Sequence, residues 1–311
     1  MEKISFVIPC YGSEKTIEPV IDEIERYVSL RPEYNYEIIC VNDASPDNVL
    51  FVLKAIAVKN KRVKVVDLAK NFGKHSAVMA GFSISDGDYV VCLDDDGQCP
   101  MDRLWDLLEP VISGEADYTM AKYDRKKESG FKSLGSKVNS YVARVLINKP
   151  KDMTFTNFKA IKRFIVDEML KYNNPYPYIE GLTLRTTRKI VTIPMEERER
   201  IEGTGNFTLK KSIALFMNGF TAFSVKPLRI ATVLGIISSL IGFIAGLVVI
   251  IKKLIFPEVQ LGYSSTMAII LFIGGMLMFM LGLIGEYIGR IYISLNNSPQ
   301  YVIREIVNED E

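Results

Sequence analysis

The stretch DYVVCLDDDGQCP, Asp88 to Pro100, joins an apolar segment to three consecutive carboxylates. Tyr89 to Leu93 has the short, β-branched composition of a buried strand. Asp94, Asp95 and Asp96 follow it directly. Adjacent carboxylates repel one another unless a cation or hydrogen-bond donors lie between them. The stretch therefore predicts either a solvated turn after a strand or a cation-binding site.

Charge is unevenly distributed along the 311 residues. The formal net charge of +1 gives no global field that would attract nucleic acid. Ile230 to Ile251 and Met267 to Gly285 contain no Lys, Arg, Asp or Glu. Apolar runs of about 20 residues match a bilayer core, and core helices of soluble domains usually keep a polar stripe. We therefore expect two membrane-spanning helices at about 228–251 and 267–288.

The same patterns predict how the chain is divided. A large domain in residues 1–207 precedes a two-helix region in residues 228–289. Residues 208–227, apolar and aromatic after a basic start, indicate an amphipathic helix in the membrane interface, or else the last helix of the large domain. The tail, 290–311, has a short strand pattern at 300–307. It could complete its own sheet, pair with a neighbour in a homo-oligomer, or fray.

Basic residues flanking the two spans predict their orientation. One group lies on the side shared by both termini and a smaller group lies between the spans: Lys210, Lys211, Lys226, Arg229 and Arg290 against Lys252 and Lys253. Cytoplasmic loops carry an excess of Lys and Arg. The bias predicts a multi-pass protein of the inner or plasma membrane, with the large domain and both termini in the cytoplasm. The first residues, MEKISFVIPCYG, agree because they lack the pattern of an export signal.

Residues 1–207 alternate between strand and helix patterns. Strands are expected at Ile4–Pro9, Glu37–Asn42, Val63–Leu68, Asp88–Leu93 and Asp117–Lys122. Helices are expected at Glu14–Ser29, Pro46–Lys59, Ser76–Ser85 and Met101–Ser113. This order predicts an α/β domain with a mainly parallel, Rossmann-like sheet wound on both faces.

Four polar clusters follow the first four predicted strands: PCYGSE, NDASPD, NFGKH and DDDGQ. The carboxyl ends of parallel strands share one edge of a sheet, where ligands bind. We therefore expect the four clusters to form a single pocket. None of them contains a Walker sequence or G-x-G-x-x-G, which argues against a P-loop ATPase and a nicotinamide dehydrogenase.

These motifs resemble the family 2 glycosyltransferases of GT-A fold, and more narrowly the polyprenyl-phosphate glycosyltransferases, which include dolichyl-phosphate mannose synthase and bacterial undecaprenyl-phosphate sugar transferases. The resemblance runs from SFVIPCYGSEKTI to the paired spans and the tail NNSPQYVIREI. It implies inverting, metal-dependent transfer of a sugar from a nucleotide sugar to a polyprenyl phosphate at the cytoplasmic face of the bilayer. A UDP-sugar is favoured over a GDP-sugar, from family frequency alone.

The resemblance also implies residues that bind the donor. Pro9, Tyr11 and Glu14 match the first-strand motif at the nucleotide, and Asp43 matches the acidic residue that contacts the base. Lys74 is expected to contact phosphate.

Asp94, Asp96 and Gln98 match the D-x-D-x-Q element that holds Mg²⁺ or Mn²⁺ and the diphosphate, with Asp94 and Asp96 as the catalytic pair. Carboxylate and amide oxygens suit a hard divalent cation, which acts as a Lewis acid on the leaving group. Asp95 belongs to the same nucleotide-binding element, with its side chain expected to cap the next helix or face solvent.

Acceptor binding is expected from a second set of residues. Lys122, Lys132 and Ser136 match positions that bind the acceptor phosphate, although Lys stands where several members have Arg, and Lys lacks the bidentate fork of Arg. RERIEGTGNFTLKK is similar to the R-x-x-G-x-S-x-Y segment and places Arg200 on it, while Gly205 and Phe207 replace its Ser and Tyr. Plain surface charge is the alternative for Arg200.

The acceptor decides whether a catalytic base is needed. A lipid phosphate is already ionised near neutral pH, whereas a sugar hydroxyl needs a base. Glu180 in PYIEGL is the best candidate base, and a solvated loop carboxylate is the alternative. His75, the only histidine, is expected near the diphosphate and not on a metal. Two other functions stay open: a transferase acting on a saccharide or lipid hydroxyl, and a membrane scaffold without catalysis.

Overall fold

The computed structural model describes residues 1–123, 155–201, 226–255, 262–296 and 298–308. The chain divides into two compact units. One unit contains Met1–Leu215 together with Asn297–Glu311, and the other contains Phe216–Asn296.

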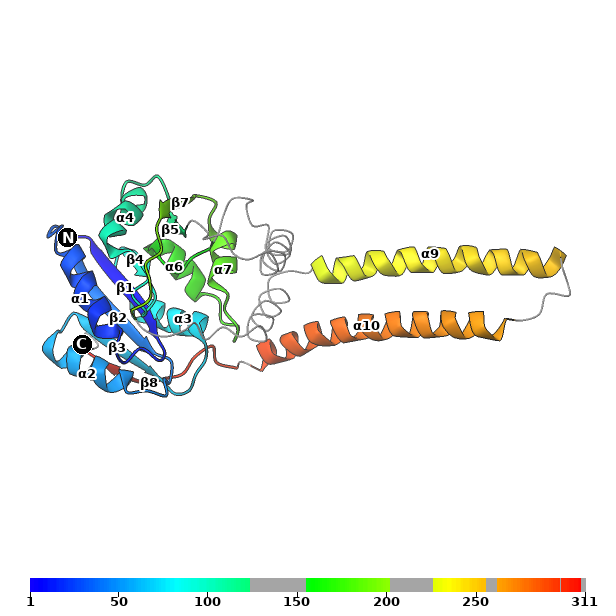
Figure 1. Ribbon diagram of the computed structural model, residues 1–311, viewed down its shortest axis with the longest axis horizontal. Helices are drawn as coiled ribbons and strands as arrows, with labels where there is room; N and C mark the ends of the chain where they lie inside the picture. Colours follow the sequence, from blue (N-terminus) through cyan, green and yellow to red (C-terminus); the bar gives the residue numbers. More distant parts are fainter. Residues whose placement is uncertain (124–154, 202–225, 256–261, 297, 309–311) are drawn as a thin grey trace. The chain divides into compact units, whose positions relative to one another are not determined.

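An eight-stranded sheet forms the centre of the first unit (Figure 1). Its strands are β1 (Lys3–Cys10), β2 (Asn35–Asn42), β3 (Val63–Leu68), β4 (Tyr89–Cys92), β5 (Tyr118–Tyr123), β6 (Lys159–Lys162), β7 (Ile190–Met195) and β8 (Ile303–Val307). They lie in the order β7-β5-β6-β4-β1-β2-β3-β8. Only β6 and β8 run antiparallel to their neighbours among these strands. The predicted mainly parallel α/β sheet is therefore confirmed.

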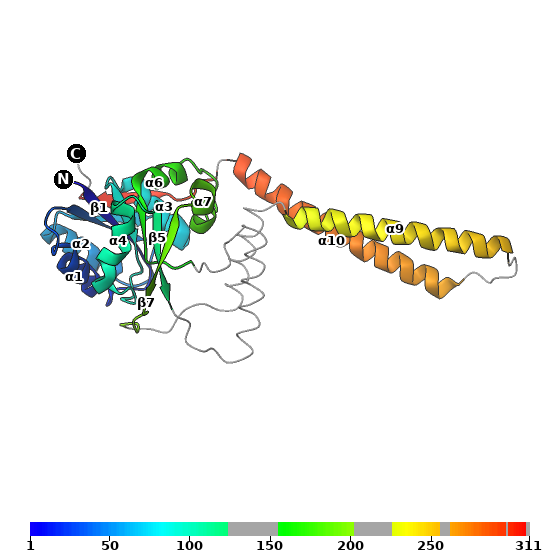
Figure 2. The same ribbon diagram turned by 90° about the horizontal axis from the view of Figure 1, so that it is seen from above.

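Helices cover both faces of the sheet (Figures 1 and 2). They are α1 (Ile17–Val28), α2 (Val49–Lys59), α3 (Lys74–Ile84), the short 3₁₀ helix η1 (Met101–Arg103), α4 (Leu104–Ile112), α6 (Arg163–Leu170) and α7 (Ile179–Thr186). On one face, α1, α2 and α4 share an apolar core with Ile4, Phe6 and Ile8 of β1. On the other face, α3 lies so close that a Cβ on Gly81 would be 2.4 Å from Cγ1 of Val7. Alternate side chains of β1 thus serve opposite layers.

The five predicted strands and four predicted helices are all present; the third strand, Val63–Leu68, has the predicted ends, and the other elements differ at one end or both. The first helix begins at Ile17 and not at Glu14, because the chain turns at Gly12, where φ is +75°. Glycine tolerates that conformation best. The tail strand is also present: β8 pairs antiparallel with β3, with Ile306 opposite Val66. Of the three alternatives for the tail, completion of its own sheet is therefore confirmed.

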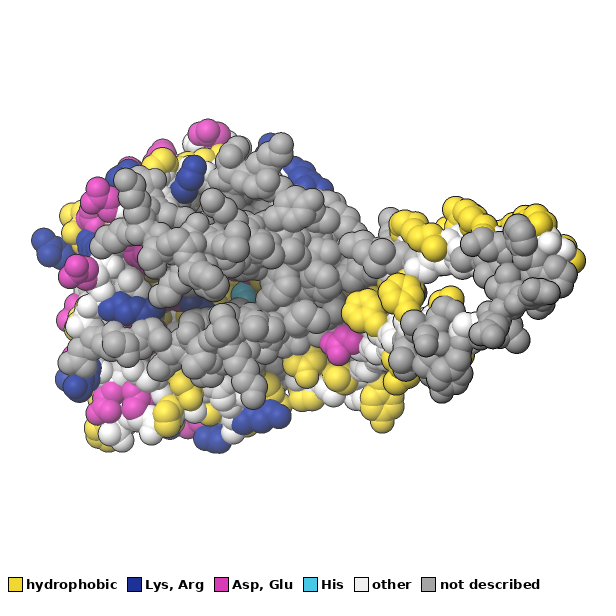
Figure 3. Space-filling model, turned by 45° about the vertical axis from the view of Figure 1, so that its right-hand side comes forward, with side chains coloured by type: hydrophobic (Ala, Val, Ile, Leu, Met, Phe, Trp, Pro, Cys, Tyr) yellow, Lys and Arg dark blue, Asp and Glu magenta, His cyan; other side chains and the backbone are white. Residues whose placement is uncertain are grey.

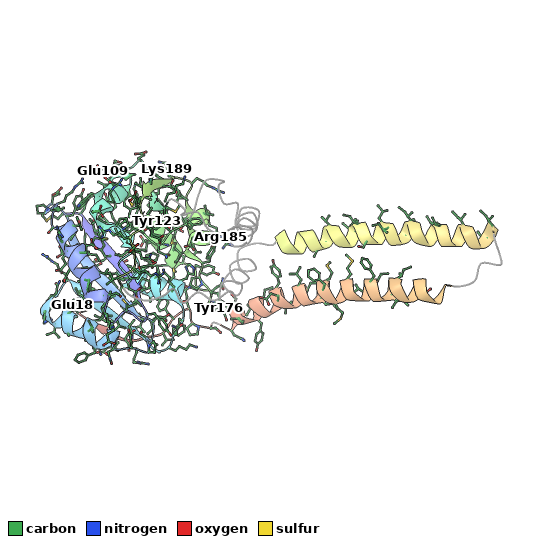
Figure 4. All side chains as sticks on the ribbon, in the orientation of Figure 1. Glu18, Glu109, Tyr123, Tyr176, Arg185 and Lys189 are labelled. Atoms are coloured by element: carbon green, nitrogen blue, oxygen red, sulfur yellow. The ribbon has the colours of Figure 1, made fainter. Side chains whose placement is uncertain are left out.

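The described residues of the second unit form two long helices, α9 (Lys226–Ile255) and α10 (Tyr263–Leu295). Both are long and apolar enough, by length and composition, to cross a membrane. Large apolar side chains such as Leu240 and Met278 are exposed along them (Figures 3 and 4). The predicted spans at 228–251 and 267–288 lie inside these helices. The interfacial helix predicted at 208–227 lies outside the described residues, apart from its last two positions.

Candidate active site

Asp94 and Asp96 follow β4 at the carboxyl edge of the sheet, and each has its own counter-cation. The Asp94 carboxylate accepts hydrogen bonds from the Lys74 ammonium and, at 2.8 Å, from Nδ2 of Asn157. Oδ2 of Asp96 lies 3.4 Å from Nη2 of Arg200. These partners offset the repulsion expected between adjacent carboxylates, because Asp94 and Asp96 each face a different positively charged side chain. The side chains of Lys74 and Arg200 are each 41% exposed, so both can change partner.

Asp95 has a different role from its two neighbours. Its Oδ2 accepts the main-chain N–H of Tyr11 at 2.9 Å, and burial raises the pKa of this carboxyl. The expectation that Asp95 caps the next helix is wrong, because neither η1 nor α4 has a side-chain cap. Asp95 instead joins the β4 turn to the loop that follows β1, where Tyr11 is half exposed.

The turn after Asp96 is bound to a distant segment of the chain. Nε2 of Gln98 donates to the carbonyl of Arg198 at 3.2 Å, and the Arg198 N–H donates to the Gln98 carbonyl at 3.2 Å. The N–H of Ile201 donates to the Asp96 carbonyl, also at 3.2 Å. These three hydrogen bonds hold the segment that contains Arg200 next to the carboxylates. Gln98 therefore lies beside the predicted pair, while its role as a metal ligand stays a prediction.

The loops after β1 and β2 are tied together. Ser45 Oγ accepts the Gly12 N–H at 2.8 Å and donates to Oδ1 of Asp47 at 2.6 Å. Asp47 in turn accepts the N–H of Glu14 at 2.9 Å, and the Glu14 carboxylate accepts the N–H of Asn48 at 3.3 Å. The predicted clusters PCYGSE and NDASPD thus form one layer of polar groups.

Two more residues that are predicted to bind the nucleotide sugar, Pro9 and Asp43, are buried at this edge of the sheet. Pro9 is buried in β1, opposite Val41 of β2. Asp43 is buried, and its carboxylate accepts the N–H groups of Phe72 at 2.7 Å and Gly73 at 2.8 Å. Burial raises the pKa of Asp43, and these two hydrogen bonds act in the opposite direction. Asp43 therefore orders the loop that leads into α3. The predicted contact between Asp43 and the nucleobase of the donor stays a prediction.

Glu180 is buried in the first turn of α7, so the alternative of a solvated loop carboxylate is wrong. Its Oε1 lies 3.7 Å from Nζ of Lys159, and its Oε2 lies 3.9 Å from Nε2 of His75. Burial opposes ionisation, but the neighbouring His75 and Lys159 bring the pKa of Glu180 below its usual value. In Figure 3 the histidine side chain is visible at the surface near basic side chains, and the His75 side chain is 22% exposed.

The acceptor set is only partly visible. Lys122 lies at the carboxyl end of β5, and Arg200 is at the carboxylates, whereas Lys132 and Ser136 lie outside the described residues. Sequence reasoning missed Asn157 and Lys159. Both reach the site because β6 pairs antiparallel with β4, and no local spacing signals that pairing.

The oxygen atoms of Asp94 and Asp96 fit a divalent cation site that is completed by the substrate. Within the described part of the chain, no three His, Cys, Asp or Glu side chains come together as a complete metal cage. Asp94 and Asp96 supply hard oxygen donors on one half-buried turn. Mg²⁺ is typically held by one or two carboxylates together with substrate phosphate oxygens. The residues therefore fit a cation that arrives with a diphosphate.

Comparison with known proteins agrees with this geometry. Residues 5–170 match the family described as Glycosyl transferase family 2, and residues 226–291 match the GtrB C-terminal hairpin. The chain resembles the solved glucosyl-3-phosphoglycerate synthase of Mycobacterium tuberculosis in complex with Mn²⁺ and UDP-glucose. The identity is 20%, the TM-score is 0.51, and 71% of this chain and 77% of that chain are covered. At that identity the likeness shows the fold alone.

Two relatives match almost the whole length of the chain. The bactoprenol glucosyl transferase of Shigella phage SfII is 31% identical, covering 97% of this chain and 98% of the relative. The undecaprenyl-phosphate 4-deoxy-4-formamido-L-arabinose transferase of Proteus mirabilis is 31% identical, covering 99% of this chain and 94% of the relative. With a family match across more than half of its residues, a sheet of GT-A type and an apolar hairpin, the chain belongs to the family 2 glycosyltransferases.

Proposed function

We propose that the protein transfers one sugar from a nucleotide sugar to a polyprenyl phosphate at the membrane surface. The observation that carries the proposal is the pair Asp94 and Asp96, each held by an exposed, exchangeable cation, in a chain that also carries an apolar hairpin. The relatives support the acceptor class, since their names give bactoprenol and undecaprenyl phosphate.

A UDP-sugar is the proposed donor. The solved relative that shares the fold was crystallised with UDP-glucose, which supports this choice over a GDP-sugar. Tyr11 offers a half-exposed ring at the nucleotide, between Asp95 and the Glu14 loop. Pro9 and Asp43 shape the strand ends beneath it. Lys74 is placed to leave Asp94 and contact the diphosphate.

The residues at the carboxyl edge then divide the work of transfer. Mg²⁺ or Mn²⁺, bound with the diphosphate by Asp94, Asp96 and the Gln98 amide oxygen, would supply Lewis-acid neutralisation of the leaving group. Lys74 adds a second positive charge to the departing phosphates. The nucleoside diphosphate leaves with the electron pair of its bond to the anomeric carbon.

The acceptor phosphate attacks that carbon from the opposite side, so the product has inverted configuration. A phosphate monoester is ionised near neutral pH, because its second pKa is about 6, and it needs no protein base. Arg200 and Lys122 lie at the carboxyl edge of the sheet, and we assign both to the acceptor phosphate. We assign Lys132 and Ser136 to the same acceptor phosphate. The orientation with the catalytic domain and both termini in the cytoplasm belongs to this proposal.

A product assay tests the proposal directly. The purified full-length protein is incubated with undecaprenyl phosphate, with Mg²⁺ or Mn²⁺, and with a panel of UDP- and GDP-sugars. We expect one lipid product, heavier by one sugar, whose formation stops when the metal is chelated, and NMR of its anomeric carbon should show inversion. A sugar found only on a hydroxyl acceptor would refute the lipid-phosphate assignment.

A second candidate function, transfer to a hydroxyl, is favoured by one observation. Oε2 of Glu180 is buried with no hydrogen-bond partner among the described residues, as a base awaiting a hydroxyl would be. Under that function Glu180→Gln should lower kcat by about a hundredfold to ten-thousandfold. Under the lipid-phosphate function the loss should be smaller. The pH profile of kcat separates the two, because only a base gives an acidic limb that disappears in the variant.

A further inference from the structure

We propose that Arg304, in the strand that follows the hairpin, is a positioning residue for the donor-binding loops. The inference rests on the proposed function, since it names a residue that prepares the same site. Arg304 lies far from the site in the sequence, within the tail NNSPQYVIREI, for which the resemblance implies no role in the site. A continuous series of hydrogen bonds joins its guanidinium to the loops after β1, β2 and β3.

The first link joins β8 to the end of β3. Nη1 of Arg304 donates to Oδ2 of Asp67 at 3.0 Å, and Nη2 donates to the carbonyl of Ala69 at 2.9 Å. The side chain of Asp67 is only 3% exposed. A buried carboxylate is costly unless it is paired and hydrogen-bonded. Arg304 therefore holds both Asp67 and the first residue of the loop that leads to α3.

The second link crosses from β3 to β2. Asn42 lies opposite Asp67 in the strand register, and its Nδ2 donates to Oδ1 of Asp67 at 2.8 Å. Its Oδ1 accepts the N–H of Ser45 at 3.1 Å. Both ends of this buried amide are thus used, one toward the carboxylate that Arg304 holds and the other toward the donor loop.

The third link is the loop layer itself. Ser45 accepts the N–H of Gly12 and donates to Asp47, which accepts the N–H of Glu14. Ala44, immediately before Ser45, has φ of +49°, a conformation that is unfavourable for residues other than glycine. Such a conformation persists only where the surrounding contacts determine it. The bond from Ser45 to Asn42 is one of those contacts, so loosening Asn42 releases the loop.

The inference predicts a specific kinetic defect. Without Arg304, Asp67 keeps the Asn42 bond but loses its charged partner, and the donor loops lose their anchor on β3. Donor binding should weaken by about tenfold, the effect of one charge-assisted hydrogen bond. Binding of the polyprenyl phosphate should not change, because no acceptor residue belongs to the series.

Three variants of the full-length protein test this. Arg304→Ala should raise the donor KM about tenfold and leave kcat and the acceptor KM near wild type. Arg304→Lys keeps the positive charge but lacks the second hydrogen-bond donor, so its donor KM should lie between those of the wild type and Arg304→Ala. The matched control is Glu305→Ala on the same strand, which removes an exposed ion pair with Lys54 that leads to no loop. It should leave the donor KM unchanged.

Two further readouts separate the inference from a structural effect and from the proposed function. Arg304→Ala and Asn42→Ala should be non-additive in donor KM, as expected for residues that act in one network. Hydrogen exchange at the amides of Gly12, Glu14 and Ser45 should speed up in Arg304→Ala even without donor. Unchanged exchange with an unchanged donor KM would overturn the inference. Faster exchange in a protein that binds no UDP would retain the positioning role and refute the donor assignment instead.

Discussion

The two edges of the central sheet both carry carboxylates paired with cations, yet the cations at the carboxyl edge are the more exposed. At the amino edge, Glu37 of β2 is buried and accepts from Ser5 Oγ at 2.5 Å and from the Asp86 N–H at 3.0 Å. Its Oε2 lies 2.9 Å from Nζ of Lys64 and 3.1 Å from Nζ of Lys3. At the carboxyl edge, Asp94 and Asp96 are more exposed.

Exposure of the partner distinguishes the two edges. The side chain of Lys64, in β3, is 7% exposed, whereas that of Lys74, at the start of α3, is 41% exposed. A buried ion pair cannot be separated without leaving an uncompensated charge, while an exposed lysine can follow a phosphate at little cost. Charge at the rim of a sheet is therefore no sign of a site by itself. Asp94 and Asp96 differ from Glu37 in that their partners have exposed side chains that can move away.

The largest expected effect is at the carboxyl edge. Asp94→Asn or Asp96→Asn should lower kcat by at least about a thousandfold, because either change removes a charge that balances the cation at the leaving group. Thermal unfolding should stay within a few degrees of wild type. Sugar transfer to undecaprenyl phosphate measures the loss.

The control for that prediction lies at the other edge. Asp86 pairs with Lys3, and its side chain is 59% exposed. Asp86→Asn should leave both activity and unfolding near wild type, since exposed pairs contribute little. Full turnover by Asp96→Asn would contradict the assignment of the metal-binding pair.

The second effect reverses the pattern. Glu37→Gln should lower the free energy of unfolding by about 3–5 kcal/mol, because it removes the negative charge that lies 2.9 Å from the buried Lys64 ammonium. Activity per folded molecule should stay unchanged. Denaturant unfolding of the full chain measures the loss. The double variant Glu37→Gln with Lys64→Met should recover most of it, and failure to recover would mean that packing and not charge accounts for the change.

Acid should act on the same group. Burial alone would raise the pKa of Glu37, but the hydrogen bonds from Ser5 and Asp86 and the Lys64 ammonium lower it to about 2 from an ordinary 4.5. The stabilisation is therefore complete above about pH 4.5 and is lost as the pH falls toward 2. It amounts to about 3 kcal/mol at neutral pH. Unfolding measured from pH 6 down to about 2.5 should show this slope, and Glu37→Gln should remove it.

The sequence predicted the features whose signals are local. Strands β1 to β4 are short Val- and Ile-rich runs between turn residues, and the clusters after them follow from the rule that parallel strands end at one edge. Asn157 and Lys159 could not be predicted in this way. They reach Asp94 and Glu180 through the pairing of β6 with β4, a contact set by the whole fold.

The distinction between the two edges was equally hidden in the sequence. Glu37 and Lys64 read as ordinary polar positions in strands, because their burial depends on Ser5 and Lys3 in another strand. The sequence sets Asp95 apart from the pair Asp94 and Asp96 but does not reveal its partner, because the Tyr11 N–H reaches it from the loop after another strand. Residue type reveals which chemistry is available, whereas burial and partner decide which residues can use it.

The smallest expected effect compares two glycines with similar backbones. Gly97 has φ of +75° and Gly114 has φ of +82°, so an alanine at either should cost about 1 kcal/mol of stability. A Cβ on Gly97 would lie 2.4 Å from Cδ1 of Ile201, whereas Gly114 has nothing within 4 Å. Gly97→Ala should therefore displace Ile201 and, with it, the adjacent Arg200 from Asp96.

The two substitutions should thus be similar in unfolding and different in binding. Calorimetric titration of UDP with Mn²⁺ should show an affinity about threefold lower for Gly97→Ala, equivalent to about 0.7 kcal/mol, and no change for Gly114→Ala. Equal affinities in both variants would mean that the Ile201 segment yields without moving Arg200. In that case the hydrogen bonds between the Asp96 turn and the Arg198 segment do not position the Arg200 guanidinium at Asp96.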